Sequence, residues 1–170
     1  MGMNEMMKWI DGNEINMKQF TGEALSEKLV AELHDYDYIQ YLAWADFFQV
    51  AAFLIEFDTE LSINGIFGFL ENSIGHYSPN IIQAFRAIGD DNDADTLEEI
   101  CHLAPPNSIR AEFISNISQE YEITSFHDNH EMAEKVEEQI SRLSEQLYLY
   151  GDFDIWPLLF KYLDEHIAQL

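Results

Sequence analysis

Apolar residues recur at intervals of three and four along most of this chain, which is the spacing of one face of an α-helix. Residues 21–35 show this spacing first, and Thr21 is expected to cap the N-terminus of their helix. The predicted inward face of this helix consists of Leu25, Leu29 and Leu33. The first 20 residues show no clear pattern and carry no prediction.

The next segment, from about Asp37 to Leu61, is apolar on nearly every side of a helix. A helix without a polar face packs against several others, so we expect this one to be the buried centre of the fold. Its large apolar residues are Trp44, Phe47, Phe48, Val50, Phe53, Leu54 and Phe57.

A glycine-rich stretch follows the central helix. Asn and Gly adopt a left-handed backbone at little cost, so Asn64-Gly65 predicts a helix end with a tight turn, and Asn72 to Gly75 predicts a second one. The segment between them predicts a short buried helix formed by Ile66, Phe67, Phe69 and Leu70. A small-molecule site beneath this turn is one possible use of it, although the stretch contains no catalytic group.

Two further helices come next. Ser78-Pro79 combines an N-cap residue with the proline favoured at the first helical position, and Gly89 ends that helix. Asn92 or Asp93 is expected to cap the following helix, which Pro105-Pro106 stops. The two predicted inward faces are formed by Ile81, Phe85 and Ile88, and by Ala94, Leu97, Ile100 or Cys101, and Ala104.

The C-terminal part predicts three more helices. The first begins at Asn107 or Ser108 and is followed by a loop at 124–129. The second spans 131–147, and Gly151 ends it. Asp154 is expected to cap the third. Their inward faces are Ile109, Phe113, Ile117 and Tyr121, then Met132, Val136, Ile140, Leu143 and Leu147, and finally Leu159, Leu163 and Ile167. Strand-type alternation is nearly absent. We therefore predict an all-α protein in which residues 1–170 form a single compact multi-helix domain around a buried central helix.

The excess of acidic residues is the strongest single feature of the sequence. The 32 acidic residues outnumber the 8 basic ones, which gives a formal charge of −24. The charge is spread evenly, since residues 1–57, 58–106 and 107–170 carry net charges of −7, −8 and −9. Such a protein repels nucleic acid and anionic membranes and attracts basic partners. We therefore expect no direct binding to nucleic acid and no membrane association.

Location follows from the single Cys101, which excludes an internal disulfide and fits a reducing cytosol. The N-terminus lacks the layout of a signal peptide. Polar residues interrupt the apolar segment that most resembles a membrane span, and they are Gln40, Asp46, Gln49 and Glu56. We expect a soluble cytoplasmic protein.

The helix expected at 131–147 carries the clearest acidic row. Glu131, Glu134, Glu138 and Glu145 lie opposite its apolar stripe. Because the rise is about 1.5 Å per residue, the first three follow one another at roughly 4.5 and 6 Å along the axis. DNA places a phosphate about every 3.4 Å on each strand, so such a row could imitate phosphates. An ordinary solvated face is the alternative, because Glu131–Lys135 and Glu138–Arg142 are typical i, i+4 pairs. A solubility role needs a net charge of only about 2–8, so the excess favours a function for the charge.

A second acidic cluster comprises Asp90, Asp91, Asp93 and Asp95. It resembles a calcium loop superficially, but Asp95 and Cys101 occupy the positions that require glycine and glutamate. Acids at a helix N-terminus explain it more simply. We include the cluster in the expected acidic surface.

No catalytic, cofactor or metal site is predicted. His127 and His130 are spaced like metal ligands, but no second ligand pair stands at a recognised distance, so a polar loop is the better interpretation. Phosphate-binding, dinucleotide-binding and nucleophile motifs are missing from the sequence. Carboxylates are too abundant for any one pair to indicate acid–base catalysis. We expect a protein that is not an enzyme.

Residues 58–89 resemble one family, the bacterial acidic DNA-mimic proteins of the DMP type. Its pattern runs Glu-Val-x-Asn-Gly-Gly-Phe-x-Gln-Phe-Phe-x-Asn-Ser-x-Gly, followed by a helix ending in Ala-x-x-x-Ile-Gly. Matching positions are Glu60-Leu61, Gly65, Phe69-Leu70, Asn72-Ser73-Ile74-Gly75 and Ala84 to Gly89. The departures are Ile63, Asn64, Ile66 and Gly68.

The resemblance implies an all-helical protein that can form a homodimer. Its acidic surface would cover the DNA-binding face of a helix-turn-helix transcription factor or a similar basic DNA-binding protein. We expect partner binding by the acids of both segments: Glu131, Glu134, Glu138, Glu145, Asp90, Asp91, Asp93 and Asp95. An immunity or antitoxin protein that neutralises a basic nuclease toxin is the alternative, because it would use a similar charge.

Overall fold

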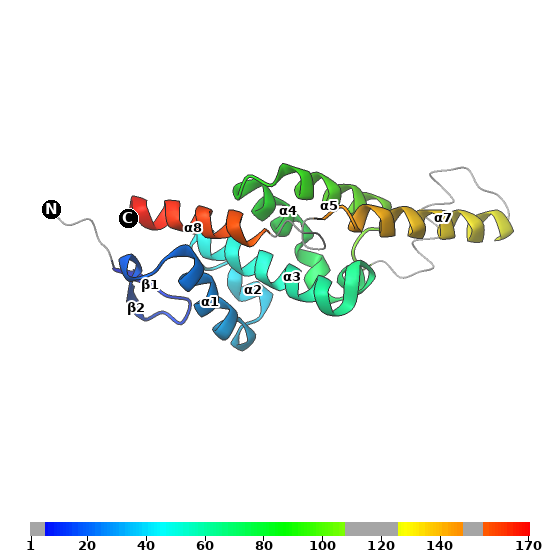
Figure 1. Cartoon of the computed structure of the whole chain (residues 1–170). Coiled ribbons are helices and arrows are strands. Elements are labelled where there is room, and N and C mark those ends of the chain that lie inside the picture. The colour runs from blue at the N-terminus through cyan, green and yellow to red at the C-terminus, as the bar shows by residue number, and fades with distance from the viewer. Residues whose placement is uncertain (1–5, 108–125, 148–154) are drawn as a thin grey trace.

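The structure is a computed structural model that describes residues 6–107, 126–147 and 155–170, with the side chains of 126–130 left out. It is almost entirely helical (Figure 1), which confirms the predicted fold class. The α-helices are α1 (Gly22–Glu32), α2 (Tyr38–Tyr41), α3 (Asp46–Glu71), α4 (Ser78–Ala87), α5 (Asp91–Leu103), α7 (Phe126–Ser144) and α8 (Trp156–Gln169). Short 3-10 helices are η1 (Met17–Gln19), η2 (Leu33–Asp35) and η3 (Ser73–Tyr77).

Helix α3 is the centre of the packing, as its apolar sequence predicts. Helix α4 lies along it and α5 lies against α4, while α1 and α8 pair with each other and both touch α3. Helix α7 packs on α5 (Figure 1). Fully buried side chains of α3 include Ala51, Ala52, Leu54 and Phe57. Within the described ranges no helix has the length and apolar character needed to cross a membrane.

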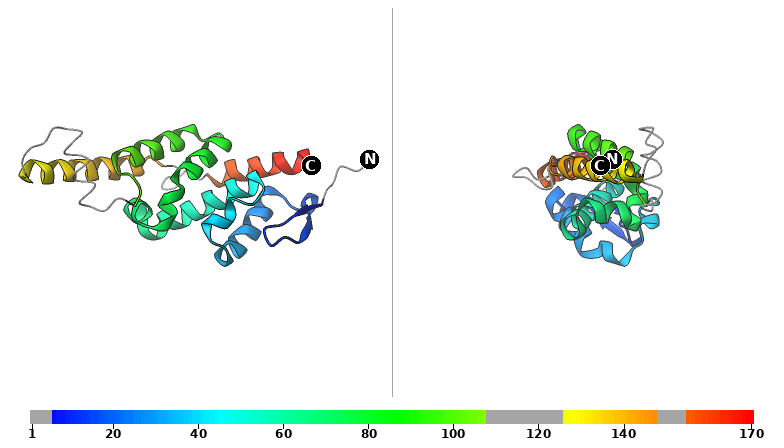
Figure 2. Two further views of the ribbon diagram at one scale, coloured as in Figure 1. Left: turned by 180° about the vertical axis from the view of Figure 1, so that it is seen from behind. Right: turned by 90° about the vertical axis from the view of Figure 1, so that its right-hand side faces the viewer.

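The described elements form an elongated body. Figure 2 shows α8 and the N-terminal hairpin at one end and α7 reaching outward at the other. The hairpin pairs β1 (Met6–Lys8) with β2 (Glu14–Asn16) in antiparallel register. Trp9, which follows β1, is buried against Phe48 of α3 with ring centroids 5.1 Å apart. The hairpin therefore closes one end of the core.

The glycine-rich stretch forms a break in α3 rather than a full helix end at Gly65. This residue has φ 69° and ψ −175°, and the helix resumes directly after it. That backbone region is open essentially only to glycine. Ile66, Phe69 and Leu70 are buried as predicted, whereas Phe67 is 39% exposed.

The helix end predicted at Asn72 to Gly75 is confirmed in position, because α3 ends at Glu71 and η3 begins at Ser73. Gly75 does not adopt a left-handed backbone, however. A Cβ atom there would lie 2.7 Å from the carbonyl oxygen of Phe69 and 3.1 Å from Cβ of Pro106. Gly75 is therefore required for close packing, not for its φ angle.

Several predicted boundaries are corrected. The central helix does not begin near Asp37, because α2 and a turn precede α3. Tyr77, not Ser78, is the N-cap of α4, and Ile155, not Asp154, is that of α8. Residues 126–129 belong to α7, so the loop predicted for 124–129 is wrong there. Asn107 is described and has a left-handed backbone with φ 61°. The rest of the helix predicted from Asn107 or Ser108, the side chains of His127 and His130, and Gly151 lie outside the described residues.

Candidate partner-binding surface

Helix α7 separates apolar and acidic side chains cleanly. Ala133, Val136 and Ile140 are buried, while Glu131, Glu134 and Glu138 are exposed on the other side. Positions 131, 134 and 138 fall within about 60° of one another around a helix with 3.6 residues per turn. Glu145 is also exposed, but it follows the last residue of α7. The helix therefore presents one continuous acidic face of three carboxylates.

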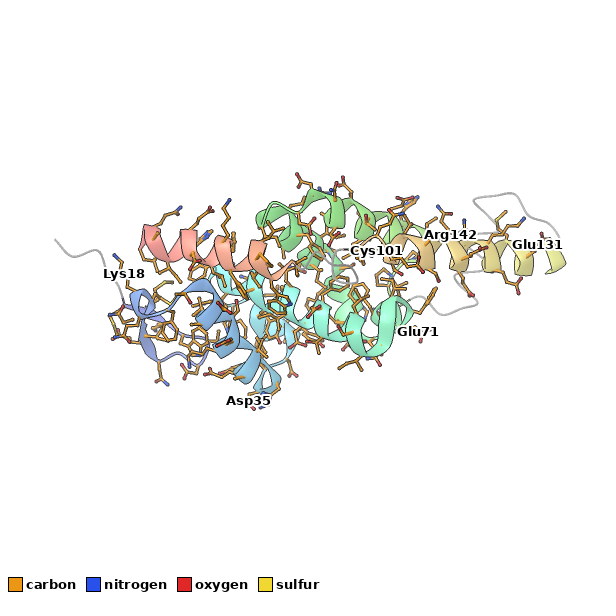
Figure 3. The ribbon with its side chains drawn as sticks, in the orientation of Figure 1. Lys18, Asp35, Glu71, Cys101, Glu131 and Arg142 are labelled. Atoms are coloured by element: carbon orange, nitrogen blue, oxygen red, sulfur yellow. The ribbon has the colours of Figure 1, made fainter. Side chains whose placement is uncertain are left out.

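The two bases of this helix are held by its own acids. Lys135 Nζ lies 3.3 Å from Glu131 Oε1, and Arg142 Nη2 lies 2.6 Å from Glu138 Oε1. Figure 3 shows Glu131 and Arg142 on this part of the chain. Exposed pairs of this kind contribute little, about 0.3–0.5 kcal/mol each. Lys135 and Arg142 are therefore held only weakly by these pairs.

The cluster at the start of α5 divides into buried and exposed members. Asp90 caps the helix, because its Oδ1 accepts a hydrogen bond from the Asp93 backbone N–H at 3.1 Å. Asp90 and Asp93 are only 2% and 1% exposed, so the expectation that they form part of an acidic surface is wrong for these two. The cap was expected at Asn92 or Asp93 and is corrected to Asp90. Burial raises the pKa of Asp90, and its hydrogen bonds with Asp93 oppose that rise.

The exposed members of the cluster gather around one arginine of α4. Arg86 Nη2 lies 2.9 Å from Asp95 and 3.2 Å from Glu98, and Arg86 Nη1 lies 3.8 Å from Asp91. Three carboxylates and one guanidinium leave a local charge of −2 at this point of the surface. Sequence reasoning missed Arg86, because it approaches these acids only where α4 and α5 turn back on each other.

Exposed acids are not confined to α5 and α7. They also occur on α1, α3 and α8, at Glu23, Glu27, Asp46, Glu71, Asp164 and Glu165. One of them has a structural task, since Asp164 Oδ1 accepts a hydrogen bond from the Gly22 backbone N–H at 2.6 Å and so ties α8 to the start of α1. Negative charge therefore extends over most of the described surface. Helix α7 differs from the other helices in the row that its carboxylates form, not in the sign of its charge.

The predicted structural turn is held by a single carboxylate. Glu60 Oε1 accepts hydrogen bonds from the side-chain amides of Asn64 and Asn72, which lie on the two sides of the Gly65 break. The turn thus fixes the angle between the two parts of α3. Among the described side chains, no three His, Cys, Asp or Glu residues converge as metal ligands.

Comparison with known proteins adds one positive finding. A family model described as DMP19-like protein matches residues 43–166, from just before α3 to within α8. No curated protein and no solved structure matches the chain.

Proposed function

The chain belongs to the DMP19-like protein family, and we propose that it acts as a DNA mimic. In this proposal it binds a basic DNA-binding protein, such as a helix-turn-helix transcription factor, and blocks that protein's access to DNA. The contact surface comprises the exposed carboxylates of α7 and those around Arg86 on α5. Buried Asp90 and Asp93 are excluded from it.

The observation that supports this proposal best is the row of exposed carboxylates on α7. Glu131, Glu134 and Glu138 follow one another at about 4.5 and 6 Å along the helix axis, which is wider than the roughly 3.4 Å axial spacing of phosphates on one DNA strand but of the same order. The surrounding bases do not neutralise the surface, because 32 acids face only 8 bases in the whole chain. A cluster of Lys and Arg that normally contacts phosphates would find a comparable pattern here.

Binding of this kind depends on charge and therefore on salt. Attraction between oppositely charged protein surfaces speeds their association. Dissolved ions screen this attraction beyond about 10 Å at 0.1 M ionic strength. We expect the affinity for the partner to fall steeply between 50 and 200 mM salt.

The first test identifies the partner and then asks whether this chain competes with DNA for it. The full chain is immobilised, exposed to nuclease-treated lysate of its source cells and eluted with rising salt, and the recovered protein is then assayed for DNA binding. Fluorescence anisotropy of labelled operator DNA should fall when the chain is added, with one chain displacing one DNA site. The proposal is overturned if no nucleic-acid-binding protein elutes, or if the recovered protein binds DNA and this chain at the same time.

A charge-matched pair of triple variants tests the role of α7. Glu131→Gln with Glu134→Gln and Glu138→Gln should weaken partner binding by about tenfold, since each exposed ion pair contributes up to about 1 kcal/mol. The control carries the same loss of three charges on α1 and α8, as Glu23→Gln, Glu27→Gln and Glu165→Gln. Equal weakening by the two triples would show that the partner responds to total charge and not to the α7 row.

Co-expression with a neighbouring toxic reading frame separates a DNA mimic from an immunity protein. An immunity protein would restore growth to cells that express a neighbouring toxic nuclease, and its target would lose nuclease activity in the complex. A DNA mimic of a transcription factor leaves such cells unprotected and changes operator occupancy instead.

A further inference from the structure

A pocket of about 580 Å³ opens beside α2, where that helix meets α3, η2 and η3. It lies apart from the α7 row and from Arg86, and it plays no part in the proposed DNA mimicry. Its polar and aromatic lining consists mainly of four tyrosines, two carboxylates and two histidines: Tyr36, Tyr38, Tyr41, Tyr77, Asp37, Glu56, His34 and His76.

The aromatic wall of this pocket is held in place by ring packing. Tyr38 contacts Tyr41 edge to face at 5.8 Å and Tyr77 at 5.6 Å between ring centroids. Phe53 supports the wall from the core, with its ring stacked on Tyr77 at 5.6 Å. Tyr41 is fully buried, whereas Tyr38 and Tyr77 are half-buried and so keep part of their surface open to the pocket. The wall is therefore preformed and does not need to reorganise to receive a ligand.

A carboxylate with no cationic partner completes the pocket. Glu56 is half-buried on α3, and burial raises its pKa, while a hydrogen bond with Tyr41 opposes the rise. Its charged neighbour on the same helix is Glu60, another acid. The lining contains two imidazoles, His34 and His76, but neither lysine nor arginine. His34 Nε2 lies 3.3 Å from Asp35 Oδ1, and no ion pair joins Glu56 to a base in the described part of the chain. The pocket thus combines electron-rich rings with a carboxylate that no lysine or arginine neutralises.

We propose that this pocket binds an organic cation, a guanidinium or ammonium group that lies against Tyr38 and Tyr77 and pairs with Glu56. Aromatic rings attract cations through the negative charge of their faces, and such contacts strengthen where water is excluded. A desolvated carboxylate gains most from a partner of opposite sign. Anionic ligands are disfavoured by Glu56 and Asp37, and a neutral apolar ligand would add no partner of opposite charge to the hydrogen bond that Glu56 already makes with Tyr41.

The cation has two possible sources with the same chemistry. It is either the side chain of an arginine or lysine on another protein, or a free quaternary ammonium compound. Cation binding by this pocket does not depend on DNA mimicry, because it can be measured with small probes and without a partner protein.

Titration of the ¹⁵N-labelled full chain with three probes provides the test. N-acetyl-L-arginine amide and tetramethylammonium represent the two sources, and N-acetyl-L-citrulline amide is a neutral isostere of the first. We expect saturable shifts of amide signals in α2 and η3 at millimolar probe, and none with citrulline, because the charge is required. Tighter binding of the arginine probe identifies a protein side chain as the ligand, and tighter binding of tetramethylammonium identifies a free compound. Absence of saturation by both cations, or equal binding of citrulline, overturns the proposal.

Variants connect the binding to the named side chains. Glu56→Gln should weaken binding by about tenfold, between the effects expected for an exposed and a buried charged partner. Glu71→Gln is the matched control, because it removes the same charge from the same helix outside the pocket. The affinity of this variant for the cationic probes should equal that of the wild type. Tyr38→Phe keeps the ring and should keep the binding, whereas Tyr38→Leu should lose it. Equal weakening by Glu56→Gln and Glu71→Gln would indicate diffuse attraction to the negative surface and would contradict a built site.

Discussion

Burial changes the pKa of individual side chains in this protein, and Glu56 is the acid for which this matters most. Glu56 is half-buried between α2 and α3, and loss of water raises its pKa above the ordinary value of 4.5. The pKa values of the neighbouring tyrosine hydroxyl groups shift in the same direction, because burial also raises the pKa of Tyr38 and of Tyr41. At this place burial therefore makes each group harder to ionise than it is in water.

The first prediction concerns the pH dependence that Glu56 imposes on stability. A carboxyl whose pKa rises on folding supports the folded state fully below its unfolded pKa, and that support is lost as pH rises through the folded pKa. Glu56→Gln removes this dependence and keeps an acceptor for Tyr41. The melting temperature of the variant relative to the wild type should therefore increase from pH 4 to pH 7, as measured by circular dichroism. A difference that stays constant over this range would show that Glu56 is solvated in the folded protein.

The second prediction concerns the reactivity of Cys101. Burial raises the pKa of its thiol to about 11, although a hydrogen bond with Ser78 acts against the rise. Only the thiolate attacks alkylating and disulfide reagents. Compared with a thiol at the ordinary value of 9.0, the thiolate population at pH 8 is lower by about a hundredfold. The reaction with dithionitrobenzoate should be slowed by a similar factor in the native protein.

The denatured chain provides the control for Cys101, because the protein contains one cysteine and the colour yield reports on it alone. Reaction at the same rate in buffer and in guanidinium chloride would contradict the burial of this thiol.

At the scale of elements, the break at Gly65 determines the course of the chain through the middle of the molecule. The two parts of α3 meet there at a backbone geometry that residues with a Cβ rarely adopt, and nothing lies within 4 Å of the Cβ position. The requirement for glycine is therefore one of backbone conformation and not of space.

The third prediction is that Gly65→Ala destabilises the fold by about 1–3 kcal/mol, the usual cost of holding a residue in this region. Ser62→Ala is the control, since Ser62 is an exposed residue of the same helix and alanine favours the helical state. Urea denaturation of the two variants measures the difference. An unchanged midpoint for Gly65→Ala would mean that the helix straightens without loss of packing.

Elements whose apolar faces repeat over several turns could be predicted from the sequence. Thr21 accepts the expected capping hydrogen bond from the Ala24 N–H, and Ile81, Phe85 and Leu159 are buried as expected. The β1–β2 hairpin could not be predicted, because strands of three residues are too short to show an alternation. The division between α2 and α3 was also hidden, since the turn at 42–45 is itself largely apolar.

The candidate surface shows the same limit. The exposed positions of α7 follow from its apolar stripe, which is a local property. The cap of α5 does not, because Asp and Asn are nearly equivalent caps and occupy every position from Asp90 to Asp93. Capping by Asp90 is the arrangement in which the body of α5 buries Ala94, Leu97 and Ile100, and in which Asp93 is buried too. Tertiary packing thus decides which acids of the cluster remain on the surface.

The whole molecule carries a formal charge of −24 in 170 residues, and the exposed acids lie on helices throughout the described body. Like charges on a compact chain repel one another and weaken the folded state. The bases relieve this repulsion only in part, since there are 8 of them against 32 acids. Most of those described already pair with a carboxylate: Lys28, Arg86, Lys135, Arg142 and Lys161, at 2.5 to 3.9 Å. A partner of opposite charge would relieve the repulsion and gain binding energy from it.

This balance leads to the last prediction, in which salt has opposite effects on folding and on binding. Raising sodium chloride from 50 to 500 mM shortens the screening length from roughly 14 to 4 Å, which reduces repulsion within the chain. The melting temperature should therefore rise, by several degrees if the relief amounts to about 1 kcal/mol. Over the same range the affinity for a basic partner should fall, because the attraction between the two proteins is screened as well. The neutral osmolyte sucrose is the control, since it raises stability by exclusion from the surface and leaves charge interactions in place. If salt lowered the melting temperature, the acids would have to be held in stabilising local pairs, and a surface of that kind would have little net attraction left for the phosphate-binding side chains of another protein.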